Sequence, residues 1–277
     1  MKWKTSENKR GKQIRRSFFH IDIPEEMCPR ETVRLVFVTD VHNCRGGLTP
    51  EEIARAVEEC RPDVIVSGGD LITARHGEFH GEQSACLLER LCDLAPVYLG
   101  EGNHESRLRE HPELYPGIYE GLREKAARLG ALWLCNEQRR LDWKGLPVSL
   151  DSFNPSLDYY DRFHPKTPGC KTVRELIGDR EPGAFHVMLS HHPDFFGDCA
   201  EWGADLTLSG HFHGGIIRVP FLGGLCGGSL RPFPKYDRGL FERGGKRLVV
   251  SSGLGLHTIP LRFNNPFELV VLELAGG

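Results

Sequence analysis

The amino-acid sequence predicts a layered α/β fold in which short buried strands alternate with helices. Short apolar runs, several of them rich in β-branched residues, are separated by amphipathic segments, and this alternation is typical of such folds. The chain has 277 residues, of which 39% are hydrophobic and 26% are charged, as in ordinary globular domains. It contains no apolar run near the ~20 residues that a membrane-spanning helix needs.

The first half of the chain gives the clearest elements. Residues 33–38 form a nearly continuous apolar run that predicts a buried strand. Thr49 and Glu52 form a capping box with Pro50 between them, which predicts the start of a helix. A second helix is expected near residues 82–92, and further strands are expected at residues 63–66 and 96–99.

The second half continues this rhythm less regularly. We expect a helix near residues 114–129, short strands near 131–135 and 146–150, and a long loop over 151–170. Further strands are predicted at residues 185–189, 205–208, 247–252 and 267–274. No internal repeat or linker divides this part of the chain, so we predict a single domain over residues 31–277.

Residues 1–30 are predicted to be a basic N-terminal extension. Residues 1–16 contain seven Lys or Arg and one Glu, a net charge of +6, so the overall charge of −3 leaves −9 for the remainder. Arg15 and Arg16 are not followed by the apolar stretch of an export signal, which favours a solvated tail. The alternative is attraction of this tail to an anionic membrane surface.

Five predicted strands are each followed by a polar cluster. In open α/β sheets, ligands bind beyond the carboxyl ends of the strands, so side chains far apart in sequence would meet at one edge. Any one cluster is equally consistent with an ordinary turn, but their common position and their Asp, Asn and His content favour a metal site. The clusters are Asp40-Val41-His42, Gly69-Asp70, Gly102-Asn103-His104-Glu105, His191 and Gly210-His211-Phe212-His213.

In this order the clusters resemble the five motifs of the calcineurin-like metallophosphoesterases, D-x-H, G-D, G-N-H-E/D, H and G-H-x-H. The resemblance covers about residues 33–274 and implies an αββα sandwich of two mixed sheets flanked by helices. It also implies two divalent metal ions, for which mixed nitrogen and oxygen ligands suit Mn, Fe or Zn. Asp40, His42 and His213 would hold one ion, Asn103, His191 and His211 would hold the other, and Asp70 would bridge them. His104 would stabilise the transition state or protonate the leaving oxygen.

The C-terminal part resembles the bacterial YkuE-like branch of phosphodiesterases within this family. The residues that carry this resemblance are 213–220, 236–241, 251–255 and 260–266. Asn43 after His42, and residues 71–75 after Asp70, depart from the motifs of the protein-phosphatase branch.

We therefore expect a hydrolase that cleaves a phosphodiester or pyrophosphate bond with a hydroxide bridging two metals. A phosphomonoesterase on the same site and a non-enzymatic binding module on this fold are the alternatives. The substrate would be a phosphorylated small molecule or a lipid-linked one, because a body of net charge −9 disfavours strong nucleic-acid binding. The 9 cysteines include no CxxC pair, which favours a reducing compartment, and we expect a cytoplasmic protein whose basic tail contacts the inner face of the membrane weakly.

Substrate contacts are less well defined by the sequence. Arg107 follows His104 by three residues and is the candidate for contact with a substrate phosphate, with a solvated surface charge as the alternative. Residues 151–170 and 221–238 are predicted to form a cap or an apolar groove, with a purely structural cluster as the alternative. The aromatic residues concerned are Tyr159, Tyr160, Phe163, Phe221, Phe233 and Tyr236.

Overall fold

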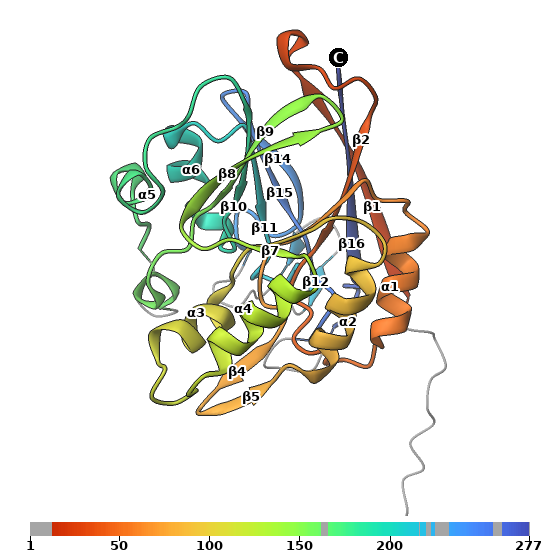
Figure 1. The fold of residues 1–277 in the computed structure, drawn as a ribbon, viewed down its shortest axis with the longest axis vertical. Helices are drawn as coiled ribbons and strands as arrows, with labels where there is room; N and C mark the ends of the chain where they lie inside the picture. Colours follow the sequence, from red (N-terminus) through yellow and green to blue (C-terminus); the bar gives the residue numbers. More distant parts are fainter. Residues whose placement is uncertain are drawn as a thin grey trace, which may run out of the picture.

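Two mixed β-sheets pack face to face, with helices on their outer faces (Figure 1). The computed structural model describes residues 13–161, 166–215, 217–219, 223–224, 233–256 and 262–276. Within these ranges, the first sheet has the order β1 (Ile14–Ile23), β16 (Phe267–Gly276), β2 (Val33–Val38), β3 (Val64–Ser67), β6 (Val97–Leu99) and β7 (Leu132–Trp133). The second has the order β14 (Gly239–Arg243), β15 (Lys246–Val250), β11 (Leu206–Ser209), β10 (Phe185–Leu189), β9 (Leu146–Ser152) and β8 (Glu137–Trp143).

Strand direction determines where the carboxyl ends lie. In the first sheet β2, β3, β6 and β7 are mutually parallel, and β16 runs antiparallel to β2. In the second sheet β9, β10, β11 and β15 are parallel, whereas β8 and β14 are antiparallel edge strands. The carboxyl ends of the parallel strands in each sheet therefore lie along one edge, and the predicted polar clusters lie directly after these ends.

The main core lies between the two sheets. Phe37 of β2, Val66 of β3, Leu150 of β9 and Val187 of β10 are all fully buried in this layer. Parallel strands that are covered on both faces need apolar residues on both faces. This is why these strands are nearly continuous apolar runs in the sequence.

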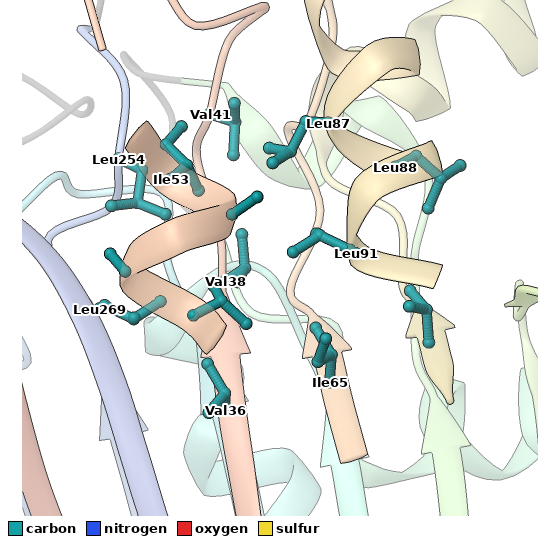
Figure 2. Close-up of a cluster of buried hydrophobic side chains, with 14 of the residues drawn as sticks. Val36, Val38, Val41, Ile53, Ile65, Leu87, Leu88, Leu91, Leu254 and Leu269 are labelled. Carbon is teal, nitrogen blue, oxygen red and sulfur yellow. The ribbon is translucent and has the colours of Figure 1, made fainter. Parts of the chain in front are cut away.

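Helices cover the outer face of each sheet. α1 (Pro50–Glu58) and α2 (Glu82–Cys92) pack on the first sheet, where Ile53 and Leu87 belong to one buried cluster with Val36 and Ile65 (Figure 2). α5 (Cys170–Ile177) and α6 (Phe196–Trp202) pack on the second sheet. This arrangement confirms the predicted αββα sandwich of two mixed sheets.

Several predicted elements have the expected bounds, and others were missed. β2, α2 and β10 match their predicted residues, and Thr49 and Glu52 exchange both hydrogen bonds of the predicted capping box. The predicted helix over 114–129 begins only at Ile118, because Gly117 before it adopts a left-handed φ of 71°. The sequence analysis missed α3 (Asn103–Glu110), α5, α6, β8, β14 and the small hairpin β4 (Thr73–Arg75) and β5 (Glu78–His80).

The predicted N-terminal extension is partly wrong, because Ile14–Ile23 form β1, a parallel strand beside β16. Ile21 and Ile23 are buried between the sheets, whereas Phe18, His20 and Asp22, on the opposite face of the strand, are exposed. Arg16 forms an ion pair with Glu59 of the segment that follows α1. This is an edge strand with one polar face, so its charges resemble those of a tail. The other basic residues of the expected tail lie outside the described residues: Lys2, Lys4, Lys9, Arg10 and Lys12.

No helix in the described ranges combines the length and the apolar character needed to cross a membrane.

The position of β1 gives a direct stability test. Ile21→Ala should lower the free energy of unfolding by about 2–5 kcal/mol, because it leaves a cavity between the sheets. Phe18→Ala on the same strand should change it by less than about 0.5 kcal/mol, because the Phe18 side chain is 60% exposed. Urea unfolding of both variants measures the difference, and equal small effects would mean that residues 14–23 do not belong to the sheet.

Candidate metal centre

The carboxyl ends of strands from both sheets bring the predicted ligands to one place. Asp40 and His42 follow β2, Asp70 follows β3, and Asn103 and His104 open α3 after β6. His191 follows β10, and His211 and His213 follow β11. The ligand atoms form three overlapping groups, each within 4.8 Å: Asp40, His42 and His213; His42, Asp70 and His104; and Asp70, His191 and His211.

Backbone conformation turns these side chains into the site. Asp40, His42, Asp70, His211 and His213 all have left-handed φ angles, of 52°, 48°, 52°, 67° and 51°. For a residue with a Cβ this conformation costs roughly 1–2 kcal/mol, and such strain is concentrated at functional sites. Five such residues lie where the carboxyl ends of the two sheets meet. Their turns therefore direct side chains into the site at a cost in folding stability.

Two glycines allow the turns to approach one another. A Cβ at Gly210 would lie 2.1 Å from Oδ2 of Asp40, and a Cβ at Gly69 would lie 2.1 Å from the backbone nitrogen of Gly102. These are closer than any real contact, so only glycine fits at either position.

The first half of the centre contains Asp40, His42 and His213. The Nε2 atoms of His42 and His213 lie 3.1 Å apart, and Nε2 of His213 lies 3.3 Å from Oδ1 of Asp40. Burial raises the pKa of Asp40 to about 6, although the proximity of His191 opposes this shift. Three donor atoms thus face one another in a desolvated volume, where a positive charge would stabilise the Asp40 carboxylate.

The predicted ligands of the second half are Asn103, His191 and His211, and ligand atoms of His191 and His211 group with Asp70. Nδ1 of His191 donates to the Gly68 carbonyl oxygen at 2.8 Å, which leaves Nε2 as the ligand nitrogen, 3.2 Å from Oδ2 of Asp70. Burial lowers the pKa of His191, but Asp70 and Asp40 outweigh it and raise that pKa to about 10. These carboxylates therefore demand a positive charge at this nitrogen, which either a proton or a metal cation would supply.

Two buried acceptor atoms test whether a metal cation fits there. Oδ1 of Asn103 is buried without a hydrogen-bond partner among the described residues, and Nε2 of His191 is buried against carboxylate oxygens of Asp70 and Asp40, at 3.2 and 3.8 Å. Leaving buried polar atoms unpaired costs about 1–3 kcal/mol each. An imidazole nitrogen, an amide oxygen and a carboxylate are all ligands of divalent first-row metals, so the donor set fits such a cation.

Glu105 connects two of the ligand loops. Its buried carboxylate accepts hydrogen bonds from the backbone nitrogens of Asp70, Leu71 and Gly102 at 2.8, 2.9 and 2.9 Å. Asp70 in turn accepts from the backbone nitrogen of His104 at 2.9 Å. Burial raises the pKa of Asp70, but His191, His104 and His42 outweigh it and hold that pKa well below its ordinary value. The loop after β3 and the start of α3 are therefore held as one unit.

Glu101 anchors the same region to the rest of the fold, and the sequence analysis missed it. Its buried carboxylate accepts from Trp133 Nε1 at 3.0 Å, from Asn154 Nδ2 at 2.6 Å and from Arg109 Nε at 3.2 Å. It lies two residues before Asn103, so this network fixes where α3 begins. An acidic residue between two glycines beside the metal motif was the only signal in the sequence.

His104 lies beside the first half of the centre, with its ring centroid 5.0 Å from that of His42. Its Nδ1 lies 2.9 Å from both the backbone nitrogen and the carbonyl oxygen of Ala74, so the backbone of Ala74 holds the orientation of the ring. Burial lowers the pKa of His104, which favours the neutral ring. Arg107 Nη1 donates to the Ala74 carbonyl oxygen at 2.8 Å and lies 3.4 Å from His104 Nδ1, so the structure places Arg107 behind His104.

A C-terminal segment between β15 and β16 also supports the site, and its role was not predicted. Asn265 is buried, and its Nδ2 donates to the carbonyl oxygens of His213, at 2.6 Å, and Gly215. Arg262 donates to the carbonyl oxygens of Ser252 and Gly255 at 2.7 and 2.6 Å. These bonds fix the turn that carries His211 and His213.

The predicted aromatic cap is only partly described. Tyr236 packs against Phe196 and Phe241 with ring centroids 5.7 and 5.2 Å apart, which is a structural cluster. Tyr160 of the 3₁₀ turn η2 (Leu157–Tyr160) lies against the histidines of the second half, with its ring centroid 5.3 Å from that of His211. Phe163 and Phe221 lie outside the described residues.

Comparison with known proteins places this site in a family. The sequence model of the calcineurin-like phosphoesterases matches residues 33–215, more than half of the chain. Two metallophosphoesterases of Bacillus subtilis (strain 168) are similar over long stretches. YkoQ is 24% identical over 96% of this chain and 93% of its own length, and YkuE is 27% identical over 79% and 70%. Phosphodiesterase YaeI of Escherichia coli (strain K12) is 24% identical over 87% of this chain and 82% of its own. The chain therefore belongs to the calcineurin-like phosphoesterase family, in its YkuE-like branch.

Proposed function

We propose that this protein hydrolyses a phosphodiester or pyrophosphate bond with two divalent cations bound at the candidate centre. Membership of the family establishes a metal-dependent phosphoesterase, and the name of YaeI favours a diester substrate. The observation that carries the proposal is a pair of buried ligand atoms: Asn103 Oδ1, which has no hydrogen-bond partner among the described residues, and His191 Nε2, which lies 3.2 Å from Oδ2 of Asp70.

The residues divide into two ligand sets. Asp40, His42 and His213 would hold one cation, and Asn103, His191 and His211 would hold the other. Asp70 would be shared, because its Oδ2 lies 3.8 Å from Nε2 of His42 and 3.2 Å from Nε2 of His191. The bound cations would supply Lewis-acid charge and lower the pKa of water, so that hydroxide is available as the nucleophile near neutral pH.

The other residues of the site would bind and orient the substrate. Two carboxylates against two divalent cations leave a net positive charge, which attracts an anionic phosphoryl group. His104 would contact a phosphoryl or leaving oxygen through Nε2, because its Nδ1 is already engaged by the backbone of Ala74. Arg107 would position His104 and offer its remaining guanidinium N–H groups to a substrate phosphate.

Two charges bear on the substrate and the location. The positive charge of the loaded centre suits a phosphorylated small molecule or a lipid-linked one as the substrate. The net charge of +6 on residues 1–16 suits weak contact with an anionic membrane surface from the cytoplasmic side.

Metal binding and turnover test the proposal together. The purified protein should bind two Mn²⁺ per chain and hydrolyse bis-(p-nitrophenyl) phosphate faster than the monoester at matched metal. Asp70→Asn should lower turnover at least about 100-fold, since it removes the shared charge. Asp93→Asn, an exposed position on the far end of α2, should behave like the wild type.

Less than one metal per chain together with no metal-stimulated turnover would contradict the proposal and favour a binding module. Preference for the monoester would favour a phosphomonoesterase on the same site.

The role of His104 can be separated from general metal chemistry. His104→Ala should lower kcat by about 10²–10⁴-fold. A series of diesters with leaving groups of increasing pKa distinguishes its two functions. A loss that is uniform across the series indicates a hydrogen bond to a phosphoryl oxygen, and a loss that grows with leaving-group pKa indicates proton donation to the leaving oxygen. Wild-type turnover by the variant would remove His104 from the mechanism.

The C-terminal support can be measured without turnover. Asn265→Ala should weaken Mn²⁺ binding by about 10–100-fold, because it releases the turn that carries His213. Asn264→Gly is the matched control, because Asn264 is exposed and its φ of 52° suits glycine. Equal affinities in a calorimetric titration would show that Asn265 has no part in metal binding.

A further inference from the structure

Tyr160 places an aromatic ring directly against the second half of the metal centre. Its ring stands edge-on to His211 at 5.3 Å and to His192 at 5.6 Å, and lies 6.5 Å from His191. η2, which carries it, is tied to α3 by a hydrogen bond from Leu157 N to Glu110 Oε2 at 3.2 Å. The ring therefore occupies a fixed position beside the imidazoles proposed to hold the second cation.

The hydroxyl of Tyr160 has no partner within the described ranges although the oxygen is buried. A tyrosine hydroxyl in such a place normally finds a hydrogen-bond acceptor, since leaving it unpaired costs about 1–3 kcal/mol. Two other buried polar atoms, Asn103 Oδ1 without a partner there and His191 Nε2 at 3.2 Å from Asp70 Oδ2, belong to the same proposed half of the centre. Both of those atoms can bind a metal cation, whereas the phenol is a hydrogen-bond donor.

One ligand combination satisfies all three atoms. A divalent cation would bind to the two acceptors, and an anionic oxygen attracted by that cation would accept the hydrogen bond of the phenol. The hydroxyl of a tyrosine is protonated at neutral pH, so Tyr160 can donate a hydrogen bond to such an oxygen.

We propose that Tyr160 is a substrate-contacting residue whose hydroxyl donates a hydrogen bond to a phosphoryl oxygen at the Asn103, His191 and His211 half of the centre. This inference rests on the proposed function, since it assigns the ligand of the same site. It also gives different roles to two neighbouring tyrosines of the loop over 151–170, because Tyr159 lies among other residues. The ring of Tyr159 lies 6.4 Å from that of Phe195, and the Lys166 ammonium lies 5.1 Å from its centroid.

Two matched variants test the proposal. Tyr160→Phe and Tyr159→Phe each remove one hydroxyl and keep the ring, so packing is preserved. Three quantities are measured on the Mn²⁺-loaded full chain: Mn²⁺ affinity, the dissociation constant of inorganic phosphate by calorimetry, and kcat/KM for bis-(p-nitrophenyl) phosphate. Tyr160→Phe should weaken phosphate binding and lower kcat/KM by about ten- to hundredfold each, with Mn²⁺ affinity unchanged. Tyr159→Phe should match the wild type in all three.

Other outcomes overturn the inference in distinguishable ways. Wild-type phosphate affinity and kcat/KM in Tyr160→Phe would show that the hydroxyl does not contact substrate. A parallel loss of Mn²⁺ affinity would assign it to the metal instead. Absence of metal-stimulated turnover in the wild type would refute the proposed function, and the phosphate titration would still decide whether Tyr160 binds an oxyanion.

Discussion

The structure depends on two carboxylates, Asp40 and Asp70, that are buried where the carboxyl ends of the two sheets meet. Both are almost completely excluded from solvent, and each faces imidazole nitrogens between 3.2 and 3.9 Å away. A buried carboxylate is stable only when positive charge or hydrogen-bond donors surround it. Backbone N–H groups supply some of the hydrogen-bond donors. The histidine nitrogens face the carboxylates, and a cation or a proton between them supplies the positive charge.

The same constraint explains why this edge of the molecule is built against local preference. Left-handed conformations at five ligand residues and two glycines that admit no Cβ bring the loops close enough for their side chains to share a small volume. That strain is held by buried hydrogen bonds from outside the ligand set, above all those of Glu105, Glu101 and Asn265. The rigid sandwich behind the site makes this possible, because the apolar strands on both sides of the core fix where each loop begins.

The sequence was sufficient to predict the features that short segments determine by themselves. Residues 33–38 gave their strand from an apolar run, Thr49 and Glu52 gave the start of α1, and the ordered Asp and His motifs indicated which loops would meet. The prediction was wrong for β1, because Arg15 and Arg16 lie on a polar-faced edge strand and their charges resembled a tail. Asn265 and Glu101 were not found as site residues, because their contacts join segments far apart in sequence that no local pattern indicates. Tyr160 was named only as one of six aromatic residues of a cap or groove, because the sequence does not indicate which of them lies beside the histidines. The roles assigned to the seven ligands, to His104 and to Arg107 remain predictions whose geometry is now defined.

The central claim is that this edge of the sandwich holds two cations, and diffraction at the manganese absorption edge tests it most directly. Anomalous difference maps from crystals grown with Mn²⁺ should contain two peaks about 3.5–4 Å apart, on either side of Asp70. One should lie within bonding distance of Asp40, His42 and His213, and the other near Asn103, His191 and His211. No peak at this edge, or a single peak that excludes one of the two ligand sets, would contradict the account.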